Sequence, residues 1–201
     1  MKNVIKHTRK GILMVTMFAT LLSFANDASL FNIKNDAKRT FLTLENVKQG
    51  NLLSVKDING VILHKETIQE TGKYTKGFDL TALPNGKYIF ELEKDLEISS
   101  IPFKVDSNLV LFDKENEKTT YKPFVRVKDD LVYVTKLNLN KSPLKIRIYF
   151  QGGADLELMY TETIVNDVKT ISKLFKLKGL NKGYYKMVFN TEGRQFVKYI
   201  N

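Results

Sequence analysis

The chain repeats its own pattern of apolar and turn residues once, and this internal repeat limits the fold more than any other feature of the sequence. In the best-matched block the corresponding residues lie 97 positions apart: Phe78, Leu80, Leu83, Gly86, Tyr88, Phe90 and Leu92 match Phe175, Leu177, Leu180, Gly183, Tyr185, Met187 and Phe189. An earlier block matches at an offset of 93, where Leu53, Val55, Asp57 and Gly60 correspond to Ile146, Ile148, Phe150 and Gly153. The repeat predicts two modules of one fold.

The matching blocks also set the expected domain boundaries. We place the first module at 29–105 and the second at 122–201, with a linker at 106–121 whose polar stretch from Asp113 to Thr120 is the expected hinge. The growth of the offset from 93 to 97 puts four extra residues in the second copy, as a surface loop would. A module of this size buries only about 60% of its unfolded surface. We therefore expect the two modules to pack together.

Apolar and polar residues alternate within each copy, which is the pattern of strands with one buried face. In 144–150 the inward set is Leu144, Ile146, Ile148 and Phe150, and the outward set is Lys145, Arg147 and Tyr149. In the first copy Tyr88, Phe90 and Leu92 are predicted inward and Lys87, Glu91 and Glu93 outward. Beyond residue 25 no apolar pattern at helical spacing lasts three turns. The predicted class is all-β: two tandem small immunoglobulin-like or fibronectin-like antiparallel β-sandwiches.

Turn residues and one tyrosine per copy complete this structural prediction. Asn59-Gly60 lies between two short apolar runs and is typical of a two-residue hairpin turn. Gly86 and Gly183 each precede a tyrosine by two residues, Tyr88 and Tyr185, at the start of a strand. A tyrosine in that place can donate its hydroxyl to the turn backbone and hold the corner between two sheets. We assign all six residues a structural role.

The first 25 residues have the pattern of a secretory signal peptide. Lys2, Lys6, Arg9 and Lys10 precede an apolar run from Ile12 to Ala25, and small residues favour cleavage after Ala25. Removal of this segment lowers the formal charge from +10 to +6, with 28 basic and 22 acidic residues left. These charges are scattered along the chain. The expected location is the periplasm, the cell surface or the extracellular space, with no nucleic-acid partner and no stable membrane span after cleavage.

Two segments of the first copy carry a resemblance to a known family. The strand that ends in Asp57-Ile58-Asn59-Gly60, and the turn from Leu80 and Leu83 to Gly86-Lys87-Tyr88, resemble the C-terminal sorting domain of the Bacteroidetes type nine secretion system. The second copy keeps the part from Leu180 to Tyr185 and closes with a Lys- and Val-containing strand, 194–200. The resemblance implies an exported protein built from small sandwich modules.

The composition leaves little material for catalysis. Cysteine is absent and histidine occurs only at His7 and His64, which excludes disulfides, thiolate metal sites and sites built from several imidazoles. Glu91 and Glu93 share the outward face of a strand about 7 Å apart, but a solvated face explains them better than an acid and a base. Asp57, Asn59 and Gly60 resemble the start of a calcium loop and are explained by a turn. We predict no catalytic residue, no metal and no cofactor.

The sequence offers slightly better candidate residues for ligand binding than for catalysis. Tyr149 and Tyr184 are out of phase with the core set and lie beside Arg147 and Lys186, an arrangement that can stack on a sugar ring. An unpaired sheet edge, or the C-terminal strand, can instead accept a strand from a protein partner. The predicted function is an exported, non-enzymatic structural or interaction module. The alternative is a cell-surface glycan-binding protein that uses the tyrosines of the second module.

Overall fold

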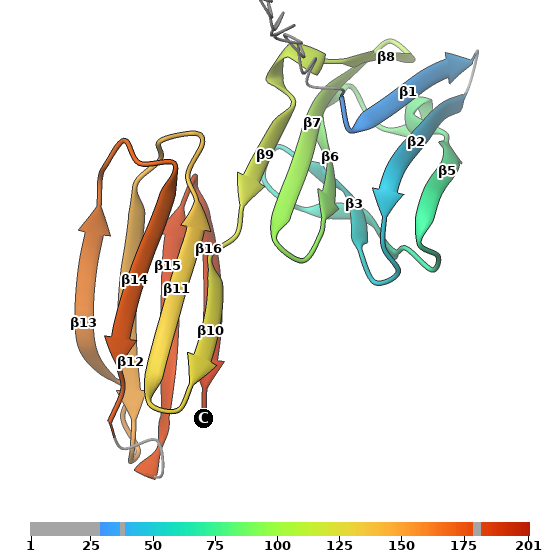
Figure 1. Cartoon of the computed structure of the whole chain (residues 1–201). Coiled ribbons are helices and arrows are strands. Elements are labelled where there is room, and N and C mark those ends of the chain that lie inside the picture. Colours follow the sequence, from blue (N-terminus) through green and yellow to red (C-terminus); the bar gives the residue numbers. More distant parts are fainter. Residues whose placement is uncertain (1–28, 37–38, 179–181) are drawn as a thin grey trace, which may run out of the picture.

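The computed structural model describes residues 29–36, 39–178 and 182–201 (Figure 1). They fold almost entirely into antiparallel strands, which confirms the predicted all-β sandwich class. Within these ranges no helix is long and apolar enough to cross a membrane. The predicted signal peptide, with its cleavage after Ala25, lies outside the described residues, as does Leu180 of the repeat.

The first copy is built from two sheets with a core between them. One sheet has the strand order β1-β2-β5, where β1 is Phe31–Asp36, β2 is Arg39–Val47 and β5 is Gly72–Phe78. The other has the order β4-β3-β6-β7-β8, and β9 also pairs with β7. Its strands are β3 (Leu52–Asp57), β4 (Ile62–Thr67), β6 (Gly86–Glu93), β7 (Glu97–Asp106), β8 (Leu109–Phe112) and β9 (Lys118–Tyr121).

The second copy repeats this strand order. A sheet β10-β11-β14 corresponds to β1-β2-β5, and a sheet β13-β12-β15-β16 corresponds to β4-β3-β6-β7. The strands are β10 (Phe124–Lys128), β11 (Leu131–Leu137), β12 (Leu144–Gln151), β13 (Glu157–Ile164), β14 (Thr170–Lys176), β15 (Tyr184–Thr191) and β16 (Arg194–Ile200). A three-stranded sheet facing a four-stranded one in this order is a fibronectin-like sandwich. The sequence repeat is therefore also a repeat of topology.

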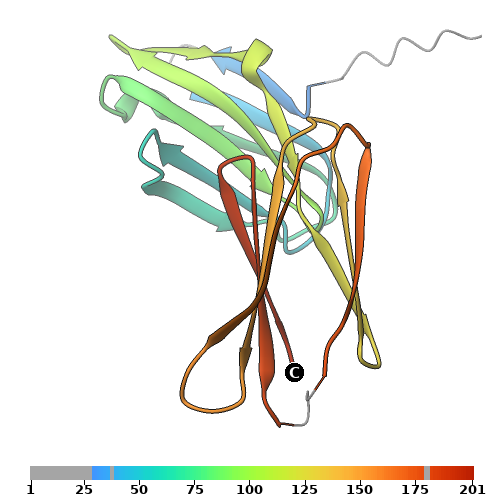
Figure 2. The ribbon, with the colours of Figure 1, turned by 90° about the vertical axis from the view of Figure 1, so that its left-hand side faces the viewer.

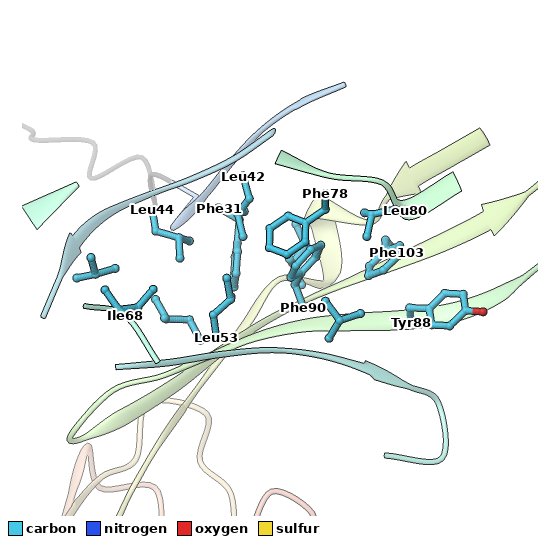
Figure 3. Packing of buried hydrophobic residues seen from close by; sticks show 14 of the residues in the cluster. Phe31, Leu42, Leu44, Leu53, Ile68, Phe78, Leu80, Tyr88, Phe90 and Phe103 are labelled. Atoms are coloured by element: carbon cyan, nitrogen blue, oxygen red, sulfur yellow. The ribbon is translucent and has the colours of Figure 1, made fainter. Parts of the chain in front are cut away.

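Each copy has its own apolar core between its sheets. In the first, Phe31 and Leu42 from one sheet face Leu53 and Phe90 from the other, and all four side chains are fully buried (Figure 3). The inward sets predicted by alternation lie in these cores, including Leu144 in the second. Burial of a leucine or phenylalanine side chain contributes roughly 1.5–3 kcal/mol. The apolar faces of the strands thus hold each sandwich together.

The predicted hairpin between β3 and β4 forms, but its loop is longer than two residues. β3 ends at Asp57, whose amide donates to the Val61 carbonyl at 3.0 Å, and the strand β4 begins at Ile62. The Asp57 carboxylate accepts the amides of Asn59 and Val61 at 2.9 and 2.8 Å. Gly60 has a φ of +86°, which glycine adopts without strain. Asp57, Asn59 and Gly60 are thus occupied as turn residues.

The segment 106–121 does not form the linker that the sequence predicts. It contains β8, a short 3-10 turn η2 (Lys114–Asn116) and β9, and both strands pair with β7. Apolar residues in 109–112 alternate between exposed and half-buried positions. Val110 and Phe112 pack against the first core, and this packing holds the segment to the sheet. The polar stretch 113–120 is likewise held to this sheet through β9, so it is no free hinge.

Candidate functional site

The two copies meet at the turn between β15 and β16, which lies beside the strands of the first copy (Figure 2). Thr191 pairs with Arg194, so the turn consists of Glu192 and Gly193 alone. Their φ angles are +52° and +73°, as a two-residue turn with both residues in the left-handed region requires. This tight turn carries the Glu192 side chain to the first copy.

Glu192 contacts both copies at once. Its carboxylate lies 3.1 Å from the Lys118 ammonium and accepts the Thr120 hydroxyl at 3.1 Å, and both of these residues belong to β9. From the second copy the Asn140 amide donates to it at 3.0 Å and also donates to the Thr119 carbonyl of β9 at 3.1 Å. The Glu192 side chain is only 1% exposed. We call this group of contacts the joint.

Lys136 of β11, in the second copy, completes the joint. It is in phase with Val132 and Val134, which are both buried in the second core, and its own side chain is fully buried. Its ammonium lies 3.4 Å from the Glu192 carboxylate and donates to the Leu137 carbonyl at 3.2 Å. A buried cation is costly unless it is paired and hydrogen-bonded. Lys136 therefore depends on Glu192, and a lysine at a core position of the alternation was the sequence signal for it.

Glu91 forms a second contact between the copies, and here the prediction of a solvated side chain is wrong. Glu91 does lie on the outward face of β6, but it is 4% exposed. Its carboxylate accepts hydrogen bonds from Lys56 of β3 and from Arg194, the first residue of β16. The outward face of a strand in one copy is thus covered by the other copy, which alternation along a single strand cannot reveal.

Both glutamates are held ionised. Burial raises the pKa of Glu91, but hydrogen bonds and charge from Arg194 and Lys56 outweigh it and bring the pKa below its ordinary value. Burial also raises the pKa of Glu192. The contacts of Glu192 with Lys118, Asn140 and Lys136 outweigh this effect, so its pKa is lowered overall. Glu93, which shares the predicted outward face with Glu91, forms an ion pair with Lys122 at 2.8 Å. All three carboxylates therefore form ion pairs within the protein.

The side between β4 and β5 carries a similar polar cluster in both copies. Glu66 of β4 accepts hydrogen bonds from Tyr74 and Lys76 of β5. In the second copy Glu162 of β13 pairs with Lys173 of β14 at 2.7 Å. His64 lies 3.5 Å from Glu66 and packs edge-on against Phe78 at 5.5 Å between ring centres. These pairs bridge the two sheets along one side of each sandwich.

Each corner tyrosine bonds back to the segment before its strand, four residues earlier in the first copy and seven residues earlier in the second. The Tyr88 hydroxyl donates to the Pro84 carbonyl, and the Tyr185 hydroxyl donates to the Lys178 carbonyl, each at 2.7 Å. The two turn glycines differ. A side-chain carbon on Gly183 would lie 2.1 Å from the Gln151 carbonyl oxygen, whereas at Gly86 the nearest atom is the Tyr88 hydroxyl at 3.4 Å. The second copy thus needs glycine for space and the first does not.

The four residues predicted for binding lie on the outer face of the β13-β12-β15-β16 sheet. Tyr149 pairs with Lys186, and Lys186 pairs with Tyr199, so the three form one row across β12, β15 and β16. The Lys186 ammonium is 6.0 Å from the centre of the Tyr199 ring. Tyr199 is 54% exposed and is absent from the predicted set, although it is out of phase with buried Ile200.

The remaining two predicted residues already have intramolecular partners. The Tyr184 hydroxyl donates to the Gln151 side chain, and the Arg147 guanidinium donates to the Asn190 side chain at 2.9 Å. Tyr149 and Tyr184 are half-buried. Across the described ranges no three side chains among His, Asp and Glu gather closely enough to hold a metal ion.

Comparison with known proteins gives a weak structural likeness. No protein-family model and no curated protein matches the chain. Among solved structures, the chain is similar to a "Biofilm associated protein - BSP domain", with 12% identity, a TM-score of 0.25, and coverage of 85% of this chain and 28% of that one. The chain thus spans less than a third of the length of that structure. At this identity and TM-score, the name of that protein says nothing about the function of this one.

Proposed function

We propose that this protein is an exported, non-enzymatic structural or interaction protein, in which two sandwich modules act as one unit. The observation that carries the proposal is the buried pair Glu192–Lys136, reached from the first copy by Lys118 and Thr120. Burial of charged groups is costly unless they stay paired, so a buried ion pair at the contact indicates that the two modules keep a fixed contact. A fixed unit presents the surfaces of both modules in one geometry, as a structural or binding protein requires.

The unit has boundaries that differ from those of the sequence repeat. We propose a signal peptide at 1–25, a first module at 29–121 and a second at 122–201. β8 and β9 belong to the first module because both pair with β7. A cut anywhere in 113–120 would therefore detach all or part of β9 from the fragment that carries β7, the strand with which β9 pairs.

The proposal includes a relationship in form to type nine sorting domains, on the motifs given above. In its support, the Gly-x-Tyr element of each copy starts a strand whose tyrosine bonds back to the preceding segment. The glycan-binding alternative stays a prediction. The Tyr149–Lys186–Tyr199 row is the part of the outer face that would serve it, whereas Tyr184 and Arg147 are engaged with Gln151 and Asn190.

Intact-mass measurement of the native protein, recovered separately from cytoplasm, periplasm, outer membrane and medium, tests the proposal. We expect one species that spans Asn26 to Asn201 outside the cytoplasm. A species that retains residues 1–25 in the cytoplasm contradicts export. A species cut within 113–120, or one that carries added mass at a new C-terminus, contradicts the single unit and makes the second module a removable sorting signal.

A further inference from the structure

Lys136 and Asn138 are two buried polar residues at the end of β11. They lie two positions apart, so their side chains share one face of the strand. Asn138 is 1% exposed, and the Lys136 side chain is fully buried. The Lys136 nitrogen lies 3.5 Å from the carboxamide oxygen of Asn138 and 3.4 Å from the Glu192 carboxylate. An amine, a carboxamide and a carboxylate therefore meet away from solvent.

The sandwich fold does not require a lysine at position 136. The β1–β2 hairpin ends in the pair Asp36–Arg39, and the β10–β11 hairpin ends in the pair Lys128–Leu131. Counted forward from these ends, Lys136 of the second copy corresponds to Leu44 of the first. Leu44 is fully buried in its core. An ammonium group is far more costly to bury than a leucine side chain, so its presence here calls for a role other than packing.

Asn138 is held in place through both its main chain and its side chain. Its backbone amide donates to the Lys169 carbonyl at 2.7 Å, and its backbone carbonyl accepts the Lys141 amide at 3.1 Å. The side-chain nitrogen lies 3.5 Å from the Val168 carbonyl oxygen, whereas the side-chain oxygen is directed to Lys136. The carboxamide carbon is one bond from that oxygen. Groups fixed at about this separation can react with one another without a large rearrangement.

We propose that Lys136 and Asn138 become joined by an isopeptide bond, which the protein forms on itself with Glu192 as the base. Glu192 takes one proton from the Lys136 ammonium, and the neutral amine attacks the carboxamide carbon of Asn138. The bond from that carbon to the side-chain nitrogen breaks. This nitrogen takes the second amine proton and leaves as ammonia, which then receives the proton held by Glu192. The described structure is the state before this reaction.

The reaction replaces a buried cation by a neutral amide, which is less costly to bury. Glu192 returns to its ionised form and keeps its contacts with Lys118, Thr120 and Asn140, so the joint persists. The bond closes a ring across only two positions of the chain, so it restricts the unfolded chain little. All three reacting groups belong to the second copy, and the inference does not depend on the proposed function.

Intact mass and tryptic mapping of the purified protein test the bond. We expect a mass about 17 Da below that of its residues, because one ammonia is lost. Trypsin should fail to cut after Lys136, so that residues 129–141 appear as one peptide that lacks about 17 Da. Lys136→Met and Glu192→Gln should each restore the full mass. The matched Lys56→Met change removes a lysine from the other buried glutamate, Glu91, and should leave the modified peptide unchanged.

A folded protein that has its full mass and is cut after Lys136 would overturn the proposal. So would a loss of ammonia that persists in Lys136→Met, because an asparagine has then cyclised on its own backbone. Circular dichroism shows whether each variant is folded. If Glu192→Gln does not fold, Lys136→Met remains decisive, since the first copy accepts an apolar residue at the same core position. A protein that carries the bond but is retained in the cytoplasm contradicts the proposed function alone.

Discussion

The two copies share a strand order but differ wherever they meet something outside their own core. Position 91 of β6 is a buried glutamate held by Arg194, and its counterpart in β15 is Val188, which is also buried. Glu192 in the β15–β16 turn is enclosed by the first copy, and its counterpart in the β6–β7 turn is Asp95, which is exposed. The core positions specify the fold in both copies, and the outward and turn positions specify which neighbour each copy contacts.

The two copies also differ at one edge of their larger sheet, the edge formed by β7 in the first copy and by β16 in the second. The edge of β7 is covered by β8 and β9 from the same chain, whereas that of β16 is free within the described ranges. Proteins usually protect exposed edges, because a free edge can pair with another chain. A module that covers its edge and one that leaves it open can therefore share a core and still differ in what they bind.

The largest expected difference between the copies is at the turn residues Glu192 and Asp95. We expect Glu192→Ala to lower the free energy of unfolding by about 3–5 kcal/mol, because it leaves the buried Lys136 ammonium without its carboxylate. Asp95→Ala, at the corresponding exposed turn, should change it by less than about 0.5 kcal/mol. Urea titration gives both values.

A second substitution shows whether the loss comes from the orphaned cation. Lys136→Met in the Glu192→Ala background should restore most of the stability, since an apolar residue of similar size can replace a buried ion pair. Equal stability of Glu192→Ala and Asp95→Ala would mean that the two turns are equivalent and that the joint contributes little.

The next difference concerns the turn glycines. We expect Gly183→Ala to destabilise the second copy by about 1–3 kcal/mol, because its new methyl group would overlap the Gln151 carbonyl and force the backbone apart. Gly86→Ala meets only an ordinary contact with Tyr88 and should cost less than about 0.5 kcal/mol. Thermal unfolding of the two variants compares them directly, and similar losses would show that the close approach at Gly183 is relieved at no cost.

The smallest effect is the acid sensitivity of the two contacts between the copies, the joint and the Glu91–Arg194 pair. Glu91 and Glu192 have pKa values below the ordinary 4.5, so the stability they contribute is fully present above about pH 4.5 and is lost as the pH falls through their lowered values. Each group can contribute a slope of up to about 1.4 kcal/mol per pH unit. We expect the copies to tumble independently in acid before either sandwich unfolds, as measured by NMR relaxation.

The variant Glu91→Gln with Glu192→Gln provides the control for this pH dependence. Neither glutamine titrates, so the coupling between the two copies should no longer change over the same acid range. Coupling in the original protein that is unchanged down to pH 2 would show that the ionised glutamates do not hold the two copies together.

Much of the fold could be predicted from sequence patterns. Alternation identified the inward faces of β6 and β12, the offsets of 93 and 97 identified the repeat, and the turn residues Asn59 and Gly60 identified the β3–β4 hairpin. For 106–121 the sequence predicts a linker and not two strands, because β8 and β9 are only four residues long. Strands that short give too few alternations to stand out from a polar loop.

What the sequence by itself determined is therefore the repeated sandwich, because each strand carries its own inward face in a local pattern with a period of two. Only the tertiary structure decided which outward residues are covered. Glu91 meets Arg194 from more than a hundred positions away, and Lys136 meets Glu192 across the second copy. A local pattern reports which side of a strand is apolar. The packing of whole modules determines whether its polar side faces water, a charged partner or an open edge.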